Sequence, residues 1–327
     1  MKQYIDLINR ILTTGIEHND RTGVGTFRIF GDMQRFNLQD GFPLLTTKKM
    51  AKKTMWVELI GFIRGITNNM WYTDHGCNIW TANQRAFAAK YDAKHPDNPW
   101  PQEEMGPIYG AQWRSFDGHY YGDEHINQGC NMGVDEVING ISDKDPKKDK
   151  SRMCYINRKG VGGFDQLKWL VNEIKTNPNN RRMIVSAWNP NQFSTMCLPP
   201  CHILWQVTVS NGKLNLMFYQ RSNDVGLGVP FNWASYATLA HILAHCANLE
   251  VGELVWTGCD VHIYKNHVEA LKIQASRAPR KLPTFKINTD IRDIEKIDWN
   301  HFELENYNPW EETDPLTTPI PKMEMAV

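Results

Sequence analysis

Two β-type runs joined by a tight turn, ILWQVTV-SNGK-LNLMFYQ, restrict the fold of this chain more than any other segment. Asn211-Gly212 at the centre is a dipeptide suited to positive φ, and β-branched and aromatic residues flank it on both sides. The run from Trp233 to Leu249 follows, rich in alanine, leucine and aromatic residues at helical spacing. These patterns predict a β-hairpin followed by a buried helix.

Other segments carry equally readable patterns. Apolar residues from Tyr4 to Leu12 follow a helical stripe that ends near Gly15, and the mixture from Thr26 to Phe36 is typical of a strand. Gly41-Phe42-Pro43 then predicts a turn, and LLTTKKM after it a functional or packing loop. Two further helices are expected, at 56–63 around a single carboxylate, Glu58, and at FDQLKWLVNEI.

Composition excludes several classes of protein. The chain has 327 residues, 41% of them hydrophobic, which permits one large domain or two average ones. Lysine plus arginine and aspartate plus glutamate both total 36, so no global field draws the chain to nucleic acid or an anionic membrane. No apolar run approaches the roughly 18 residues of a membrane span, and the first residues lack the pattern of a signal peptide. Seven cysteines without a CxxC pair argue against a disulfide scaffold or a structural zinc site, so we expect a cytoplasmic protein.

Residues 115–163 differ in amino-acid composition from the rest of the chain. They are rich in glycine, aspartate, lysine and asparagine and have few periodic apolar positions. The sequence predicts an inserted surface excursion here, within a single domain over 1–327.

Cys201 is a candidate nucleophile. It follows two prolines, which stiffen the backbone before it, and a thiol reacts as a thiolate when a positive charge lies near. Arg221, at the end of the second β run, could supply that charge. A Cys201-His202 hydrolase dyad is disfavoured, because neighbouring residues on a strand point to opposite faces. The alternative for Cys201 is a small buried apolar residue.

Polar residues elsewhere suit a nucleotide. Guanidinium groups favour bidentate contacts to phosphate, and Ser222 could add a hydroxyl donor, although each could equally be a solvated surface group. Asn232 could read one edge of a pyrimidine or cap a helix. His262 and Tyr264 alternate by two and so share a strand face, where they could hold a sugar hydroxyl or form a core pair. The arginines in short polar settings are Arg21, Arg181, Arg182 and Arg221.

His241 and His245 are four residues apart in the expected helix after the hairpin. That spacing could bind a metal, but no third ligand lies nearby in the sequence. We therefore expect ordinary helix histidines and no metal site.

In order and wording, these segments resemble the thymidylate synthase family over nearly the whole chain. The matching motifs are DRTGVGT, FNLQDGFPLLTTKK, ELIGFIRG, GPIYGAQWR, NNRRMIVSAWNP, LPPCH, YQRSNDVGLGVPFNWASY, GCDVHIY and the terminal MAV. The resemblance implies an α/β (α+β) fold with a large mixed β-sheet flanked by helices, and a homodimer whose sheets pack face to face.

The resemblance also implies roles, position by position. Cys201 would add to C6 of a deoxyuridylate ring, and Asn232 would read the O4 and N3 edge, where cytosine-acting hydroxymethylases carry aspartate. Glu58 would organise proton transfer through water, helped by His202 and Tyr109. Arg21, Arg221 and Ser222 would grip the phosphate, with Arg181 and Arg182 reaching in from the partner subunit, and His262 and Tyr264 would bind the ribose 3′ hydroxyl. Trp80, Asp224, Gly228, Ala326 and Val327 would surround the folate, and Lys48 would meet its polyglutamate tail.

The reaction implied is methyl transfer. Thiolate addition at C6 makes C5 nucleophilic, C5 takes a one-carbon unit from 5,10-methylenetetrahydrofolate, and hydride transfer gives thymidylate and dihydrofolate. A deoxyuridylate hydroxymethylase, which adds water instead of hydride, is the alternative; a virus that modifies its DNA would need one, and the location would then be host cytoplasm. A catalytically inactive binding protein on this fold is a remote third reading. Three departures bear on the choice: Thr81 after Trp80 in place of an aspartate, Gly61 in place of a tryptophan, and the long excursion at 115–163. The intact MAV tail favours the synthase, since its closure would exclude water.

Overall fold

The computed structural model describes residues 1–20, 22–118, 163–311 and 318–325. Contacts divide the chain into two compact units, which we describe separately: residues 1–55, 178–181 and 201–327, and residues 56–177 and 182–200. In the described ranges, no helix has the length and hydropathy needed to cross a membrane. The single domain over 1–327 stays a prediction, and most of the predicted excursion, 119–162, lies outside the described residues.

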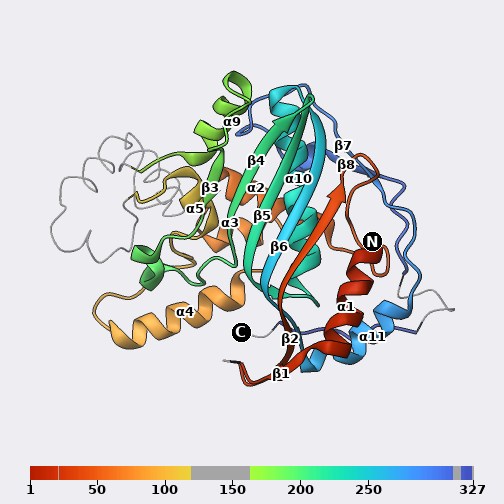
Figure 1. Ribbon diagram of the computed structural model, residues 1–327. Coiled ribbons are helices and arrows are strands. Elements are labelled where there is room, and N and C mark those ends of the chain that lie inside the picture. Colours follow the sequence, from red (N-terminus) through yellow and green to blue (C-terminus); the bar gives the residue numbers. More distant parts are fainter. Residues whose placement is uncertain (21, 119–162, 312–317, 326–327) are drawn as a thin grey trace. The chain divides into compact units, whose positions relative to one another are not determined.

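The first unit is built on a mixed sheet with strand order β1-β2-β6-β5-β4 (Figure 1). Pairing is antiparallel for β1–β2, β2–β6 and β4–β5, and parallel for β5–β6. The predicted α/β class with a large mixed sheet is therefore confirmed. The strands span Ile16–His18 (β1), Thr26–Asn37 (β2), His202–Ser210 (β4), Lys213–Asp224 (β5) and Glu250–Tyr264 (β6).

The predicted hairpin is β4 and β5. Asn211 and Gly212 have φ of 51° and 73°, the left-handed conformation that a tight primed turn requires, and Ser210 pairs with Lys213 across it. The register shifts between His202 and Leu204, where the ladder has a bulge. Beyond that bulge, the beginning of β4 lies beside the end of β5.

The predicted buried helix is α10, Gly228–Ala247, which connects the parallel strands β5 and β6. It begins at Gly228 rather than Trp233. Pro230 fits its first turn, because the first backbone N–H groups of a helix have no partner within the helix. Asn232 therefore lies inside the helix, and the alternative that it caps the helix is wrong.

Aromatic rings fix α10 against one face of the sheet. The Tyr236 ring stacks on Phe218 of β5 with centroids 4.0 Å apart, and the Trp233 ring lies 5.3 Å from Trp256 of β6. Phe36 of β2 also packs against Trp233, at 4.9 Å. Burying such rings stabilises by about 1.5–3 kcal/mol for a large apolar side chain, so this layer fixes α10 against the middle of β5 and β6.

The remaining elements of this unit surround the sheet. The expected N-terminal helix is present, and its buried side chains Tyr4, Leu7, Ile8 and Ile11 form the predicted stripe. The bounds are Lys2–Thr14 (α1), Lys265–His267 (η2), Val268–Ser276 (α11), Thr284–Ile287 (β7), Trp299–His301 (η3) and Phe302–Glu305 (β8).

The second unit is mainly helical. The two predicted helices are confirmed as α2 and α9, and Leu167, Leu170 and Ile174 are buried as expected. Phe116 and Phe164 pair as an isolated antiparallel bridge, so the two ends of the excursion lie side by side. The bounds are Lys52–Arg64 (α2, which begins in the first unit), Asn69–Asp74 (α3), Thr81–Lys94 (α4), Tyr109–Arg114 (α5), Gln166–Thr176 (α9), Ile184–Ser186 (β3) and Pro190–Thr195 (η1).

Candidate active site

The pairing of β4 with β5 brings Cys201 and Arg221 together. The Arg221 backbone N–H donates to the Cys201 carbonyl at 2.8 Å, and its Nη2 donates to Cys201 Sγ at 4.0 Å. Cys201 as a residue is half-buried. A guanidinium donor on the sulfur is the partner that a nucleophilic thiolate needs.

His202 points away from this pair and into the core. Its Nδ1 lies 2.9 Å from the Tyr236 hydroxyl of α10, and burial lowers the pKa of His202 to about 3. The imidazole is therefore neutral at physiological pH. This geometry agrees with the argument against a Cys201-His202 dyad, because the two side chains have different partners.

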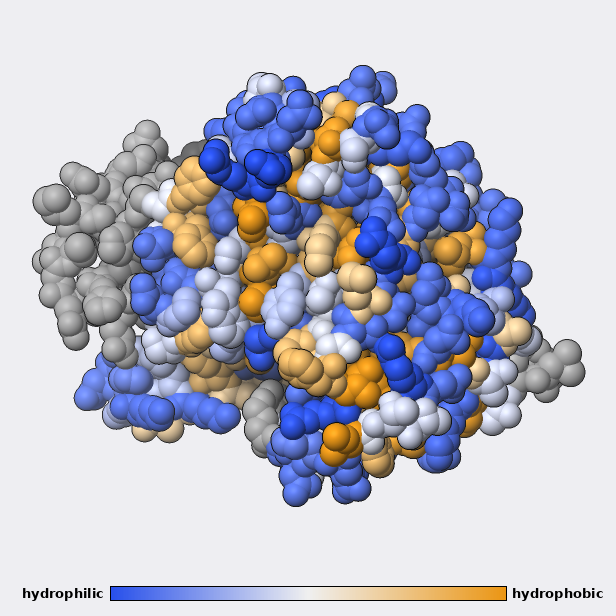
Figure 2. All heavy atoms as spheres, in the orientation of Figure 1, coloured by the Kyte–Doolittle hydropathy of each residue, from blue (hydrophilic) through white to orange (hydrophobic). Residues whose placement is uncertain are grey.

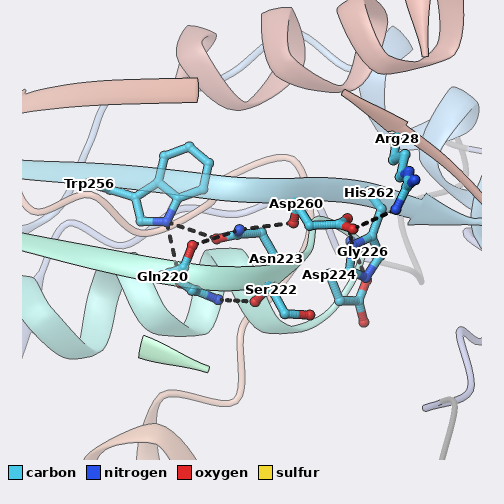
Figure 3. Close-up of polar contacts among 9 residues, drawn as sticks. All are labelled: Arg28, Gln220, Ser222, Asn223, Asp224, Gly226, Trp256, Asp260 and His262. Atoms are coloured by element: carbon cyan, nitrogen blue, oxygen red, sulfur yellow. Dashed lines mark hydrogen bonds and ion pairs between the residues drawn. The ribbon is translucent and has the colours of Figure 1, made fainter. Parts of the chain in front are cut away.

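A polar network crosses β5 and β6 at their carboxyl ends (Figure 3). The His262 ring faces Asp260, with Nδ1 2.8 Å from Oδ1, and Arg28 of β2 donates to Asp260 Oδ2 at 3.1 Å. The hydrogen bond with His262 is the largest effect and lowers the pKa of Asp260; burial opposes it, and Arg28 lowers the pKa further. Tyr264 lies two residues on, and its ring centroid is 5.2 Å from that of His262.

Buried amides support the same strand ends. Asn223 Nδ2 donates to the backbone oxygens of Gln220 and Asp260 at 3.0 and 2.9 Å, which ties β5 to β6. The Trp256 indole donates to Gln220 Oε1 and Asn223 Oδ1, and Gln220 Nε2 donates to the Ser222 carbonyl at 3.0 Å. The sequence reasoning missed Gln220, Asn223 and Asp260; only Asp260 carried a signal, since it alternates with His262 on one strand face.

Asp224, Gly228 and Asn232 come together where β5 turns into α10. Asp224 Oδ1 accepts from the backbone N–H of Gly226 at 2.9 Å, which shapes the turn. A Cβ on Gly228 would lie 3.9 Å from both Asn232 Nδ2 and the Asp224 side chain. The carboxylate and the carboxamide therefore border the same short stretch of backbone.

Lys48 extends this cluster from the predicted loop. Its Nζ donates to the Gly226 carbonyl at 3.1 Å. Burial lowers the pKa of Lys48 to about 8, and the nearby Asp224 opposes that shift. The lysine therefore faces the turn that carries Asp224.

Two of the arginines predicted to bind phosphate, Arg181 and Arg182, are exposed. Arg181 belongs to the first unit, where its carbonyl accepts from Gln206 Nε2 of β4 at 3.0 Å, and its side chain is exposed. Arg182 is also exposed and belongs to the second unit. Arg21, Ala326 and Val327 lie outside the described residues.

The second unit holds the carboxylate Glu58. Burial raises the pKa of Glu58 to about 7, and the indole N–H of Trp80 opposes that rise. Within the described residues this buried indole nitrogen does not reach the geometry of an ordinary hydrogen bond. The buried Tyr109 ring lies 5.9 Å from Trp80, and both pack on Phe62. A carboxyl that titrates near neutral pH can both accept and give a proton, which is the property of a general acid-base group.

The two single-residue departures have local explanations. Thr81 Oγ1 accepts from Asn69 Nδ2 at 3.3 Å, and the same amide donates to Glu103 Oε2 at 2.7 Å, so the threonine joins α4 to a neighbouring polar pair. At Gly61, a Cβ would collide with the ring of Tyr72, whose hydroxyl donates to the Ile66 carbonyl at 3.0 Å. Tyr72 therefore fills the space that a larger residue at position 61 would need.

The described histidines of α10 are ordinary core and surface groups. The His241 ring packs against Phe42 and Phe285, with centroids 6.1 and 5.0 Å away, and His245 Nε2 lies 2.9 Å from the Ile291 carbonyl. Across the described ranges, no group of three or more His, Cys, Asp or Glu residues is arranged to hold a metal ion.

Comparison with known proteins gives one consistent family. The model of the family described as thymidylate synthase matches residues 2–317. Proteins named thymidylate synthase from two strains of varicella-zoster virus, Dumas and the Oka vaccine strain, are each 39% identical to this chain over 325 residues. That alignment covers 99% of this chain and 94% of each relative. The chain therefore belongs to the thymidylate synthase family.

Proposed function

We propose that this chain converts deoxyuridylate to thymidylate, with Cys201 as the nucleophile that adds to C6 of the pyrimidine. The contact between Arg221 and the Cys201 sulfur carries this proposal, since it provides the charge that a thiolate requires. Addition at C6 pushes electrons toward O4, and C5 becomes nucleophilic enough to take a one-carbon unit.

The residues at the ends of β5 and β6 bind the nucleotide. Arg221 and Ser222 contact the phosphate, and Arg221 thereby serves both the anion and the thiolate. His262 and Tyr264 bind the ribose 3′ hydroxyl; with Nδ1 directed at Asp260, Nε2 is the ring nitrogen that meets the sugar. Arg21 contributes to the phosphate site as the family resemblance implies.

Asn232 reads the base. Its side-chain amide has both a donor and an acceptor, which match the O4 and N3–H of uracil, whereas cytosine presents the opposite pattern. The position of Asn232 beside Gly228, in the first turns of a rigid buried helix, supports this role because it limits how far the amide can move. The Asn232 amide also stabilises the negative charge that develops on O4.

Glu58 manages the proton steps through water, helped by Tyr109 and by the neutral His202. A pKa near 7 supports the assignment, because such a carboxyl changes protonation state during turnover at neutral pH. The glutamate thus serves the removal of the C5 proton.

The co-substrate is 5,10-methylenetetrahydrofolate, which donates the one-carbon unit and the hydride. Its site comprises Trp80, Asp224, Gly228, Ala326 and Val327, with Lys48 toward the polyglutamate tail. The chemistry of the donors fits: Asp224 can accept from a pterin N–H group, and Gly228 leaves room beside it, since a Cβ there would meet nothing closer than 3.9 Å.

A homodimer completes the assembly. The strand register places Leu204, Met217 and Met33 on the sheet face opposite α10, and their exposed fractions are 37%, 46% and 52%. Figure 2 shows hydrophobic residues in orange among pale ones over these strands. A second copy would bury this face, and the exposed Arg181 and Arg182 would reach the partner's phosphate site.

One assay tests the reaction. The protein is incubated with deoxyuridylate and 5,10-methylenetetrahydrofolate, and dihydrofolate formation is followed by absorbance. The mass of the nucleotide product is then measured by mass spectrometry. Thymidylate with one equivalent of dihydrofolate is expected. A 5-hydroxymethyl product without dihydrofolate would contradict the synthase, and bound substrates without turnover would indicate an inactive protein. We place the activity in the cytoplasm, or in host cytoplasm if the chain is viral.

A further inference from the structure

His267 connects the Asp224 turn to the C-terminal segment, residues 318–325. It is the last residue of η2 and the N-cap of α11, and its side chain is fully buried. Its Nε2 lies 2.7 Å from the Glu324 carbonyl oxygen, and its Nδ1 lies 3.8 Å from Asp224 Oδ1. The imidazole therefore stands between a main-chain acceptor and a carboxylate.

Both partners of His267 are acceptors, and this determines what its proton does. A neutral imidazole has a single N–H and can donate to only one of them, whereas an imidazolium donates to both. Protonation therefore adds a charge-assisted contact to Asp224 without giving up the bond to Glu324.

Packing leaves this arrangement little freedom. A Cβ on Gly226 would lie 2.7 Å from His267 Nδ1, 3.2 Å from Met323 Sδ and 3.3 Å from Asp224 Oδ1. The turn, the imidazole and the C-terminal segment thus meet at a point without room for a methyl group. A displacement of any one of the three therefore requires the other two to shift.

The groups around His267 have opposing effects on its pKa. Burial is the largest effect and lowers the pKa of His267; Lys48 also lowers it, and the N-terminal end of α11 disfavours a cation. Asp224 and the Glu324 carbonyl raise it and outweigh the opposing effects, so the pKa lies above the ordinary histidine value. The Tyr264 ring meets the imidazole edge-on with centroids 5.6 Å apart, and the Tyr4 hydroxyl is directed elsewhere, to the Val225 carbonyl at 2.8 Å.

A second anchor on the same segment does not titrate. Arg277 Nη2 donates to the Thr318 carbonyl at 2.7 Å, and its Nη1 donates to the Thr47 carbonyl at 2.9 Å. A guanidinium keeps its charge at every working pH. Arg277 therefore offers a matched control for an effect that depends on the proton of His267.

We propose that protonated His267 is a positioning residue that ties residues 318–325 to the Asp224 turn, so that the proton on His267 sets how firmly this part of the folate site is held. The consequence for turnover rests on the proposed function, because only there does Asp224 meet the folate. The tie itself is a property of the free protein. Since the folded pKa is raised, the tie is complete below the ordinary histidine pKa and is lost as pH rises through the folded value.

Hydrogen exchange measured by mass spectrometry in the free protein tests the tie. Peptides covering 318–325 are followed from about pH 6 to about pH 9, with exchange corrected for its intrinsic pH dependence. Protection should fall about tenfold as pH rises, which corresponds to about 1.4 kcal/mol. His267→Gln should show reduced, pH-independent protection, because its amide can donate to Glu324 without titrating. Arg277→Gln should lose protection yet keep the pH dependence.

A pH-independent wild type would overturn the proposal, and so would a His267→Gln variant that retains the wild-type pH profile. The wild-type series needs no variant to fold. With turnover as the second measurement, His267→Gln should raise the KM for methylenetetrahydrofolate about tenfold more than it lowers kcat. Because exchange is measured without substrate, a protein that shows the tie but no turnover would refute the proposed function and leave the tie intact.

Discussion

Replacing Glu58 with glutamine should stabilise the folded protein at pH 8 while removing most of its turnover. Burial raises the pKa of Glu58 from 4.5 to about 7. That difference, at 1.36 kcal/mol per pKa unit, corresponds to about 3 kcal/mol. The folded state therefore holds the Glu58 proton more tightly than the unfolded state does.

The sign follows from linkage. Between the two pKa values the folded state binds more protons, so the free energy of unfolding falls as pH rises. The cost of the buried charge is absent below the unfolded pKa and fully present above the folded one. Glutamine keeps the shape and carries no charge, and so Glu58→Gln should gain about 2–3 kcal/mol at pH 8 and less than about 1 kcal/mol at pH 5.

Urea unfolding at both pH values measures this difference. Protein concentration must be held fixed, because dimer formation would shift the apparent stability. The control is Glu269→Gln on α11, whose side chain is 76% exposed and pairs with Lys272 in the same helix; it should change stability by less than about 0.5 kcal/mol. The kcat of Glu58→Gln should fall by about 10²–10⁴-fold. A variant no more stable than wild type at pH 8 would refute the reasoning.

Four further predictions concern the nucleotide site and the sheet face opposite α10. Cys201→Ala should abolish turnover and leave the protein folded, as circular dichroism would show; residual activity would refute the assignment of the nucleophile. Arg221→Ala should slow alkylation of Cys201 by iodoacetamide about tenfold at pH 7, because the thiolate loses its positive partner; an unchanged rate would mean that the contact does not activate the sulfur. Asp260→Asn should raise the KM for deoxyuridylate about tenfold by releasing the His262 ring, with a smaller effect on kcat. Met217→Glu should dissociate the dimer in analytical ultracentrifugation, while Lys272→Glu, at an exposed position on α11, should not.

Much of the local structure could be predicted from residue patterns. Asn211-Gly212 specified the hairpin because few dipeptides tolerate two positive φ values in succession. The stripes of α1 and α9 appeared as predicted, since burial on one face imposes helical spacing. The start of α10 was misplaced, because the glycine and proline that usually break a helix occupy its first turn, where they cost little.

The residues of the site also form two groups: those suggested by the sequence and those that were not predicted. Family motifs suggested roles for Cys201, Arg221 and Asn232, and those roles stay proposals; the fold brings Cys201 and Arg221 together and puts Asn232 near the start of α10. The supporting residues were not predicted: Asn223 and Gln220 look like ordinary polar residues until β5 pairs with β6. Whether a polar side chain is buried depends on the strand that pairs with its own, and here β6 lies well beyond β5 in the chain.

By itself, the sequence determined the family, the hairpin and the main helices, because periodicity, turn chemistry and motif wording are local properties, and it pointed to Cys201 as the proposed nucleophile. Only the tertiary structure decided the electrostatics. Packing makes Glu58 titrate near pH 7 and keeps His202 neutral, and it places the His267 imidazole between Asp224 and Glu324, residues far apart in the chain. The physical reason is that desolvation and charge interactions depend on distances in space, and those distances are set only when the chain has folded.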